Sequence, residues 1–477
     1  MDIICNKEQL EKAVASCLRA VSTRTAYKLL EGINLRADGG ALVMNCTDNE
    51  IGIECKLHVH VESGGQLTVE AKLFGDMVRR LPDSVVRIYS VDDSKVNIIS
   101  GDASFELFTL KGDEFPPFPE VSRDTVYSID QHLFKKMLQK THFAISLDES
   151  RKALTGLLME GSGGEITAVA VDGFRIALSR YQTEGAGNNA KGATAGTGAE
   201  VGAGAAAGAE SAAGDGDDGG DGGGAEAGPV AGAGPGGVGG YVGGSKDDYG
   251  SGSDAIANGD NGGDESDNDG GGDSAIDGGG GKEESVVKGG SEGIRVIIPG
   301  KTVNELMRII PSSEGKLYLY GSRNQMIVEF DNCRVYTGII EGEFFNYKYI
   351  VPEQTVTDVV VRTIDLLEAI ERASLIISTE FIKRYPILLN VLGEAIEVKS
   401  TSNLGAVDEK VKAEAQGKDL EVAFNPRFLA DALKSIEDEY LKISFTSEVG
   451  QCLLRPVDND SFVHLILPVK RMADNRA

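Results

Sequence analysis

The sequence predicts an α+β protein built from three repeated domains, each with two helices packed on antiparallel sheets. Three observations support this. The chain has 477 residues, enough for about three ordinary domains. Three segments open with a strand and an amphipathic helix, and a second helix of similar sequence follows in each. With one low-complexity stretch left out, the repeats have a period of about 123 residues, the size of a domain rather than of a solenoid repeat.

The first helix of each repeat follows a short strand and a capping residue. The predicted caps are Asn6, Asp130 and Thr363. Apolar residues then recur at helical spacing, which is typical of a helix with one buried face. The strands preceding the caps are 3–5, 126–129 and 359–361.

A strand pair and a second helix complete each repeat. The predicted strand pairs are 32–35 with 45–48, 156–159 with 170–173, and 388–391 with 400–402. The predicted second helices lie within 69–82, 298–311 and 424–436. Repeated units of one ancestry often form arcs that close into rings through head-to-tail contacts, so we expect a ring-forming protein.

A segment of different composition interrupts the second repeat. Residues 185–290 consist mainly of Gly, Ala, Asp, Ser and Asn, with 19 acids against 4 lysines. Such a stretch buries too little apolar surface to offset its ordering entropy, so we expect it to be disordered. It carries roughly −15 of the net charge of −27, so the acidic total does not exclude a basic surface elsewhere. The predicted domains are therefore 1–121, 122–347 with the insert at 185–290, and 348–477.

The six cysteines form no C-x-x-C pair, and we expect buried thiols in a reducing compartment. The first residues have no basic region followed by an apolar stretch, and no run of about 18 apolar residues exists. These features predict a soluble cytoplasmic protein.

Several motifs offer an alternative function, a nucleotide- or metal-binding enzyme. Gly300-Lys301-Thr302 resembles the end of a phosphate-binding loop, but Arg295 stands where the first glycine belongs. The Asp-rich run 265–270 resembles the start of a calcium loop, but Ile276 replaces its closing glutamate. His58 and His60 lack a third ligand nearby in the sequence. We therefore expect no cofactor and no metal, and a binding protein rather than an enzyme.

Basic residues recur on the predicted helices, and Lys72, Lys301 and Arg427 align at the start of the second helix in all three repeats. A solvated helix face explains any one of them. Their recurrence favours a shared basic surface that contacts phosphates without reading bases, because no reading element accompanies it.

With these features combined, the chain resembles the bacterial DNA sliding clamp, the β subunit of DNA polymerase III. The resemblance covers everything except the insert and the last few residues. Its most specific motifs are Asp172-Gly173-Phe174-Arg175 and the closing run Leu465-Ile466-Leu467-Pro468-Val469. It implies a non-catalytic processivity factor in DNA replication: a head-to-tail homodimer ring that encircles duplex DNA and tethers the replicative polymerase, the clamp loader and repair proteins through short linear motifs.

The resemblance also implies particular site residues. Those expected to face DNA are Arg24, Lys72, Arg79, Arg80, Lys301 and Arg427. Those expected to form the partner-peptide pocket are Leu154, Val171, Gly173, Phe174, Arg175, Ile176, Phe345, Tyr349, Ile350, Leu465, Leu467, Pro468 and Val469. Ile376 and Ile377 are expected at the dimer interface. The chain departs from the family where Phe174 replaces a frequent His, where Phe345 replaces a frequent Pro, and where 471–477 extend past the usual end and could cross the pocket.

Overall fold

The structure is a computed structural model of the chain. It describes residues 1–22, 25–111, 115–118, 126–162, 164–182, 293–321, 324–352, 354–377 and 386–469. The predicted disorder of 185–290 and the expected course of 471–477 fall outside these ranges.

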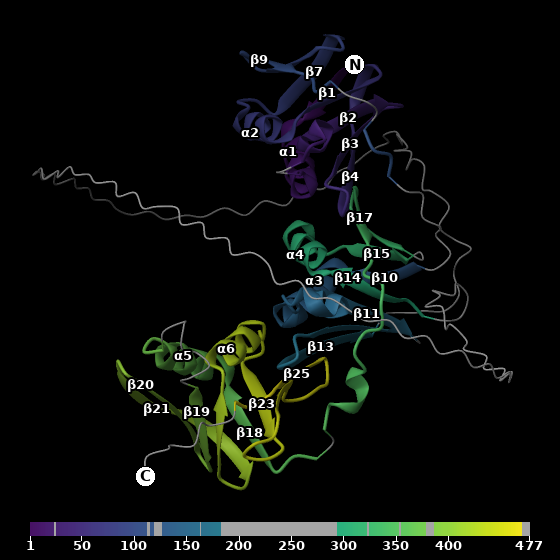
Figure 1. The fold of residues 1–477 in the computed structure, drawn as a ribbon. Helices are drawn as coiled ribbons and strands as arrows, with labels where there is room; N and C mark the ends of the chain where they lie inside the picture. Colours follow the sequence, from purple (N-terminus) through teal and green to yellow (C-terminus); the bar gives the residue numbers. More distant parts are fainter. Residues whose placement is uncertain are drawn as a thin grey trace, which may run out of the picture. The chain divides into compact units, whose positions relative to one another are not determined.

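The first repeat contains two helices and two sheet segments (Figure 1). Its elements are β1 Asp2–Asn6, α1 Lys7–Cys17, β2 Gly32–Asp38, β3 Ala41–Thr47, β4 Ile51–His58, β5 His60–Ser63, β6 Gly65–Glu70, α2 Ala71–Arg80, β7 Val85–Asp92, β8 Lys95–Ser100 and β9 Ala103–Phe108.

The second repeat follows the same order, with residues 183–292 falling between two of its strands. Its elements are β10 Val126–Asp130, α3 Gln131–Thr141, β11 Gly156–Ser162, β12 Glu165–Val171, β13 Arg175–Gln182, β14 Arg295–Pro299, α4 Gly300–Ile309, β15 Lys316–Gly321, β16 Gln325–Phe330 and β17 Cys333–Gly338.

The third repeat repeats the order again, with one long strand, β21, where the first repeat has two. Its elements are β18 Thr357–Arg362, α5 Thr363–Ser374, β19 Ile387–Leu392, β20 Ala395–Ser402, β21 Gly405–Gly417, β22 Leu420–Phe424, α6 Pro426–Lys434, β23 Tyr440–Phe445, β24 Cys452–Pro456 and β25 Phe462–Ile466. Short 3-10 turns occur at Leu18–Ala20, Lys28–Glu31, His142–Ala144, Glu149–Thr155 and Tyr347–Tyr349.

The repeats join through their sheets. β4 of the first repeat pairs antiparallel with β17 of the second, and β13 of the second pairs antiparallel with β25 of the third. We call these two contacts the first and second junctions. Both use the same register: the first residue of one strand faces the fifth residue of the other. The predicted α+β architecture of three similar domains is confirmed.

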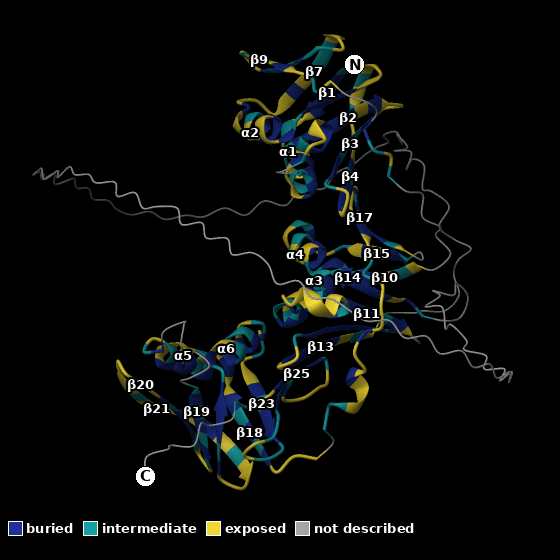
Figure 2. Cartoon of the chain, in the orientation of Figure 1, coloured by how far each residue is buried: buried dark blue, intermediate teal, exposed yellow. Residues whose placement is uncertain are grey.

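Amphipathic helices explain the core. In each repeat the two helices lie against each other and bury one face on the sheets, leaving exposed residues on the outer side (Figure 2). Phe74, Phe134 and Phe424 are fully buried. Each such aromatic contributes about 1.5–3 kcal/mol relative to an exposed position.

Two predicted helix caps need correction. Asn6 caps α1 as expected, its side chain accepting a hydrogen bond from the Gln9 amide. The cap of α5 is Arg362, and Thr363 is the first helical residue, donating its hydroxyl to the Asp438 carbonyl at 2.6 Å. Asp130 occupies the cap position of α3, but its carboxylate pairs with Lys316 instead. Tertiary contacts here replace the local capping bond that the sequence suggested.

The cysteine prediction was wrong for one pair. Cys55 and Cys333 form a disulfide between β4 and β17, with their Cα atoms 4.2 Å apart. The other four cysteines are buried free thiols, as expected. Cys55 and Cys333 are 278 positions apart in sequence, so spacing alone could not pair them.

Candidate functional sites

The start of the second helix carries a basic residue in each repeat. Lys72, Lys301 and Arg427 each occupy the second position of α2, α4 and α6, and all three are exposed. In α2 and α6 a side chain caps the amide of this same residue, since Glu70 binds the Lys72 amide and Asn425 the Arg427 amide. The predicted structural equivalence of these positions is therefore confirmed.

Lys301 is held by acids of the preceding repeat. Its ammonium lies 2.6 Å from a carboxylate oxygen of Asp48 and 2.6 Å from one of Glu50. Partial burial lowers the pKa of Lys301, but the two hydrogen bonds outweigh it and the pKa lies above its usual value. Lys301 thus ties the first junction, and a phosphate must compete with two carboxylates to reach it.

The other predicted DNA-facing cations differ in whether they form ion pairs. Lys72 and Arg80 are exposed and make no ion pair within the part of the chain that the structure describes. Arg79 pairs with Asp76 at 3.1 Å, and Arg427 lies 3.8 Å from Asp431. Such exposed pairs are weak, so these arginines can exchange a carboxylate for a phosphate. Arg24 lies outside the described residues.

An apolar cluster spans the second junction and contains much of the predicted pocket. Leu154, Val171, Ile176 and Leu465 pack together in it, and Ile350 lies against it. Sequence reasoning did not assign the other eight members to the pocket: Leu158, Val169, Leu178, Ile297, Phe344, Tyr347, Leu453 and Val463. Phe344 and Tyr347 sit in the segment between the second and third repeats, where no strand or helix periodicity marks a buried face.

Arg175, which neighbours the cluster residue Ile176 in the chain, links the second and third repeats. Its guanidinium binds Asp172 at 2.9 Å, Asp431 at 2.9 Å and the Phe143 carbonyl at 2.7 Å. It also lies over the Phe143 and Phe428 rings, 5.1 and 4.6 Å from their centroids. Only 7% of Arg175 is exposed. Its guanidinium is therefore bound by groups of the protein itself.

The turn before β13 fixes two pocket residues. Gly173 has a φ of +92°, a left-handed conformation that favours glycine. Asp172 accepts hydrogen bonds from the amides of Phe174 and Arg175. Phe174 then stacks on Phe428, with ring centroids 5.8 Å apart. The Leu467 amide donates to the Phe174 carbonyl, and the Val469 amide donates to Ala423.

Four residues of the predicted pocket expose apolar side chains. Phe174, Phe345, Tyr349 and Leu467 are 56%, 42%, 88% and 38% exposed, while Pro468 and Val469 are half-buried. A hollow of about 310 Å³ shares Leu178, Tyr347 and Val351 with the cluster and is otherwise lined by polar side chains such as Glu160 and Arg180. An apolar rim around a packed junction suits the apolar anchors of a peptide.

Two side chains near the second junction, His464 and Tyr347, have shifted pKa values that favour their neutral forms. Burial lowers the pKa of His464, which lies between Phe143 and Phe462, to about 3, so its ring is neutral at pH 7. Burial and a hydrogen bond to Glu160 raise the pKa of Tyr347. His464 belongs to β25, Tyr347 belongs to the segment between the second and third repeats, and both are buried.

The end of α5 presents a different apolar residue from those predicted. Ile377 is 8% exposed and packs in the core of the third repeat, and Ile376 is half-buried. Leu375 is 81% exposed. The helical turn that places Ile377 inward places Leu375 outward, and the sequence alone did not fix that phase.

The alternative chemical motifs find little support in the geometry. Thr302 is buried, and its hydroxyl hydrogen-bonds to Thr337 rather than facing a phosphate. His60 pairs with Glu62. Within the described ranges no group of three His, Cys, Asp or Glu side chains could hold a metal ion, and no helix there is long and apolar enough to span a membrane. The Asp-rich run at 265–270 lies outside those ranges.

Comparison with known protein families accounts for all three repeats. The description "DNA polymerase III beta subunit, N-terminal domain" matches residues 1–119, the central domain of that subunit matches 128–194 and 282–346, and its C-terminal domain matches 348–470. The second match breaks where the insert lies.

Whole-length relatives agree. The chain is 25% identical to a beta sliding clamp of Halalkalibacterium halodurans over 98% of its length and 100% of the relative's. It is 24% identical to that of Bacillus subtilis, over 98% and 100%. Among solved structures, a putative DNA polymerase III beta subunit from Eubacterium rectale has a TM-score of 0.71 at 24% identity, covering 98% of this chain and 99% of that one. The Bacillus subtilis DNA polymerase sliding clamp has a TM-score of 0.72 at 23% identity, with the same coverage.

Proposed function

This chain belongs to the DNA polymerase III beta subunit family, and from that premise we propose that it is a DNA polymerase processivity factor that encircles duplex DNA as a ring. The observation that carries the proposal is the three-fold repetition of one domain, matched to the family over 1–119, 128–194, 282–346 and 348–470. The role is non-catalytic: topology rather than tight binding retains the clamp, and diffuse phosphate contacts let it slide. We expect it to act in the cytoplasm.

The test uses the full chain loaded by its own clamp loader onto nicked circular DNA. A ring stays on the circle through gel filtration and runs off after the DNA is cut once. Retention on linear DNA with free ends would contradict encirclement. Blocking both ends with bound protein serves as the control, because it should restore retention.

We further propose that the ring consists of two copies joined head to tail. Both junctions inside the chain pair the fourth strand of one domain, β4 or β13, with the last strand of the next, β17 or β25. Two equivalent strands take no part in these junctions: β9, the last strand of the first repeat, and β21, the fourth strand of the third repeat. Among the described residues, β9 pairs with β8 alone, and the first half of β21 pairs with β20 alone. A second copy offers each edge its missing neighbour, which also removes two open sheet edges.

The shared register predicts how these edges meet. The fifth residue of β21 is Glu409, and it should face Ala103, the first residue of β9, in the other copy. Val407 then faces Phe105, and both are half-buried in the single chain. Pairing would complete the burial of two apolar side chains at the new junction.

The turn before each fourth strand supplies a second contact. In the first two repeats its exposed residue meets the second helix of the next repeat: Glu50 reaches Lys301, and Phe174 stacks on Phe428. In the third repeat the equivalent residue is Leu404, whose amide binds Ser402 as the Glu50 amide binds Asp48. Leu404 is 71% exposed, and Leu73 in the second helix of the first repeat is 49% exposed. We propose that Leu404 contacts Leu73 of the other copy.

An engineered crosslink tests this register. Glu409→Cys combined with Ala103→Cys reproduces at the third junction the positions that Cys55 and Cys333 occupy at the first. Mild oxidation should give a covalent dimer that survives denaturation. Asp408→Cys with Ala103→Cys is the matched control, because alternate strand residues point to opposite faces. Equal crosslinking in both, or none in the first, would contradict the register.

We propose that the apolar cluster at the second junction, with its exposed rim, captures the linear motifs of replication and repair proteins. The pocket comprises Leu154, Val171, Ile176 and Leu465, with Phe174, Phe345, Tyr349, Ile350, Leu467, Pro468 and Val469 around them. A labelled peptide copying the clamp-binding segment of the replicative polymerase is the probe. Leu154→Ala should weaken its binding by about tenfold or more, as expected for a buried apolar anchor site, whereas Leu147→Ala should not. Equal binding to both variants would place the site elsewhere.

A further inference from the structure

The disulfide at the first junction has no counterpart at the second. Cys55 is the fifth residue of β4, and Cys333 is the first residue of β17, directly opposite it. At the second junction the same two positions hold Ser179 and Phe462. The second junction pairs in the same register without a covalent link. A sulfur bridge is therefore not needed to form this kind of junction.

Other interactions already hold the first junction. Lys301 binds Asp48 and Glu50 across it, and Arg334 binds Glu54 at 3.4 Å. One continuous apolar core runs through the first and second repeats, and both half-cystines belong to it. The reduced pair would remain packed as two small apolar side chains. The junction should thus keep its fold in either redox state.

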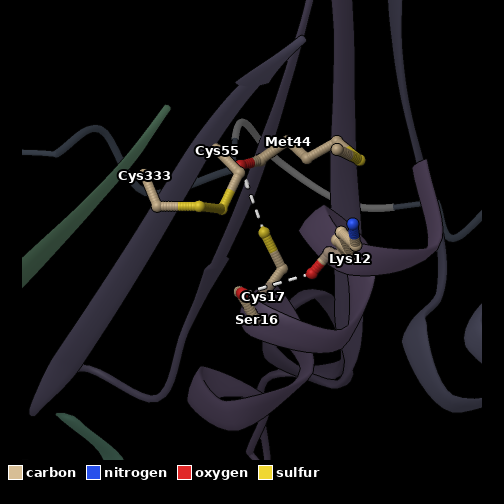
Figure 3. Close-up of a disulfide and its surroundings, with 6 residues drawn as sticks. All are labelled: Lys12, Ser16, Cys17, Met44, Cys55 and Cys333. Carbon is tan, nitrogen blue, oxygen red and sulfur yellow. Dashed lines mark hydrogen bonds between the residues drawn. A yellow bond between two sulfur atoms is a disulfide. The ribbon is translucent and has the colours of Figure 1, made fainter. Parts of the chain in front are cut away.

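The surroundings favour exchange with an outside thiol over exchange within the protein. Cys17 lies nearby but donates its thiol to the Met44 carbonyl (Figure 3). Burial raises the pKa of Cys46, so this thiol stays protonated. Cys55 is fully buried, whereas Cys333 is 8% exposed. Cys333 is the less buried of the two and is the first residue of β17, so an external thiolate reaches its sulfur when this strand end opens.

We propose that Cys55 and Cys333 form a reversible redox site that locks the first repeat to the second. A thiolate of a dithiol reductant attacks the Cys333 sulfur, the bond to Cys55 breaks, and Cys55 leaves as a thiolate that takes up a proton. The second thiol of the reductant then releases Cys333, giving two protein thiols and one oxidised dithiol. An oxidised dithiol reverses both steps.

The expected consequence is a change in coupling rather than in fold. With the bond closed, the first repeat cannot separate from the second even when their ladder opens. With the bond open, separation is limited by the ladder and its ion pairs alone. A covalent link between residues 278 positions apart also restricts the unfolded chain strongly.

The test begins with the full chain purified without reductant and treated with an oxidised dithiol. Alkylation in denaturant followed by mass measurement should label four of the six cysteines, and all six after treatment with a reduced dithiol. Peptide mapping should place the two protected thiols at Cys55 and Cys333. Labelling of all six in the oxidised sample would overturn the proposal.

A second measurement distinguishes a disulfide that forms and breaks reversibly from one that the fold requires. Reduction should leave the circular dichroism spectrum unchanged but lower the urea midpoint, and reoxidation should restore it. Cys55→Ser should have the same urea midpoint in oxidising and reducing conditions, while Cys452→Ser, which removes a buried unpaired thiol, should retain the redox response. Loss of the folded spectrum on reduction, or an unchanged urea midpoint, would each contradict the proposal.

Discussion

The two junctions inside this chain use one backbone plan with two kinds of side-chain chemistry. Both pair five residues in the same register, and both bring a turn of one repeat to the second helix of the next. The first junction is closed by a disulfide and by the ion pairs of Lys301. The second is closed by the buried guanidinium of Arg175 and by the stack of Phe174 on Phe428.

This difference shows where a repeated protein can gain a binding site. The first junction joins its two repeats through a single apolar core that contains residues of both. The second has its own apolar cluster, set apart from the two larger cores, with four large side chains exposed around it. A separate apolar cluster at a contact between repeats is consistent with the peptide site that we propose there.

The largest expected effect comes from removing Arg175. Arg175→Ala removes a buried guanidinium with its hydrogen bonds to Asp172, Asp431 and the Phe143 carbonyl, and it leaves the mostly buried Asp172 without its cation. The free energy of unfolding should fall by about 3–5 kcal/mol. Arg427→Ala is the matched control, because Arg427 is 70% exposed and lies 3.8 Å from the same Asp431. Its cost should stay within about 0.5 kcal/mol. Urea unfolding measures both, and similar losses for the two variants would show that Arg175 does not hold the second junction.

The stack and the ion pair at the two turns offer the next comparison. Phe174→Ala should cost about 1 kcal/mol through loss of the aromatic contact with Phe428. Glu50→Ala should cost less than about 0.5 kcal/mol, since Glu50 is 70% exposed and Asp48 still holds Lys301. Urea midpoints at constant slope provide the measurement. A larger loss for Glu50→Ala would reverse the assignment of an aromatic and an ionic junction.

Particular residues show what the sequence could and could not predict. Repetition revealed the equivalence of Lys72, Lys301 and Arg427, because aligned positions in one fold must share their backbone place. It did not reveal that the charge of Lys301 is balanced by two carboxylates, since Asp48 and Glu50 come from another repeat. The disulfide was missed for the same reason. Phe344 and Tyr347 were missed because an irregular segment carries no periodic signal of burial.

The contrast between Lys72 and Lys301 predicts unequal roles in DNA binding. Lys72→Ala should weaken binding to a labelled duplex roughly threefold at low salt and reduce the salt slope by up to about one phosphate contact. Lys301→Ala should change it little, because two carboxylates already occupy the ammonium. Fluorescence anisotropy across a salt series gives both quantities. If Lys301→Ala has the larger effect, the ion pairs at the first junction must break when DNA is present.

The smallest expected effect is the loss of stability at acidic pH that comes from Glu160, which binds the segment linking the second and third repeats. Burial raises the pKa of Glu160, but hydrogen bonds from Tyr347 and Arg295 outweigh this and keep that pKa below its usual value. A carboxyl group with a lowered folded-state pKa stabilises the protein fully above its unfolded pKa of about 4.3, and this stabilisation is lost as the pH falls through the folded pKa. Wild type should therefore lose more stability than Glu160→Gln between pH 7 and about pH 3, measured as urea midpoints. Glu165→Gln, which removes a carboxylate bound only to uncharged Thr167 and Gln182, should behave like wild type. Parallel pH profiles for wild type and Glu160→Gln would mean that the Tyr347 contact does not anchor this segment of the second junction.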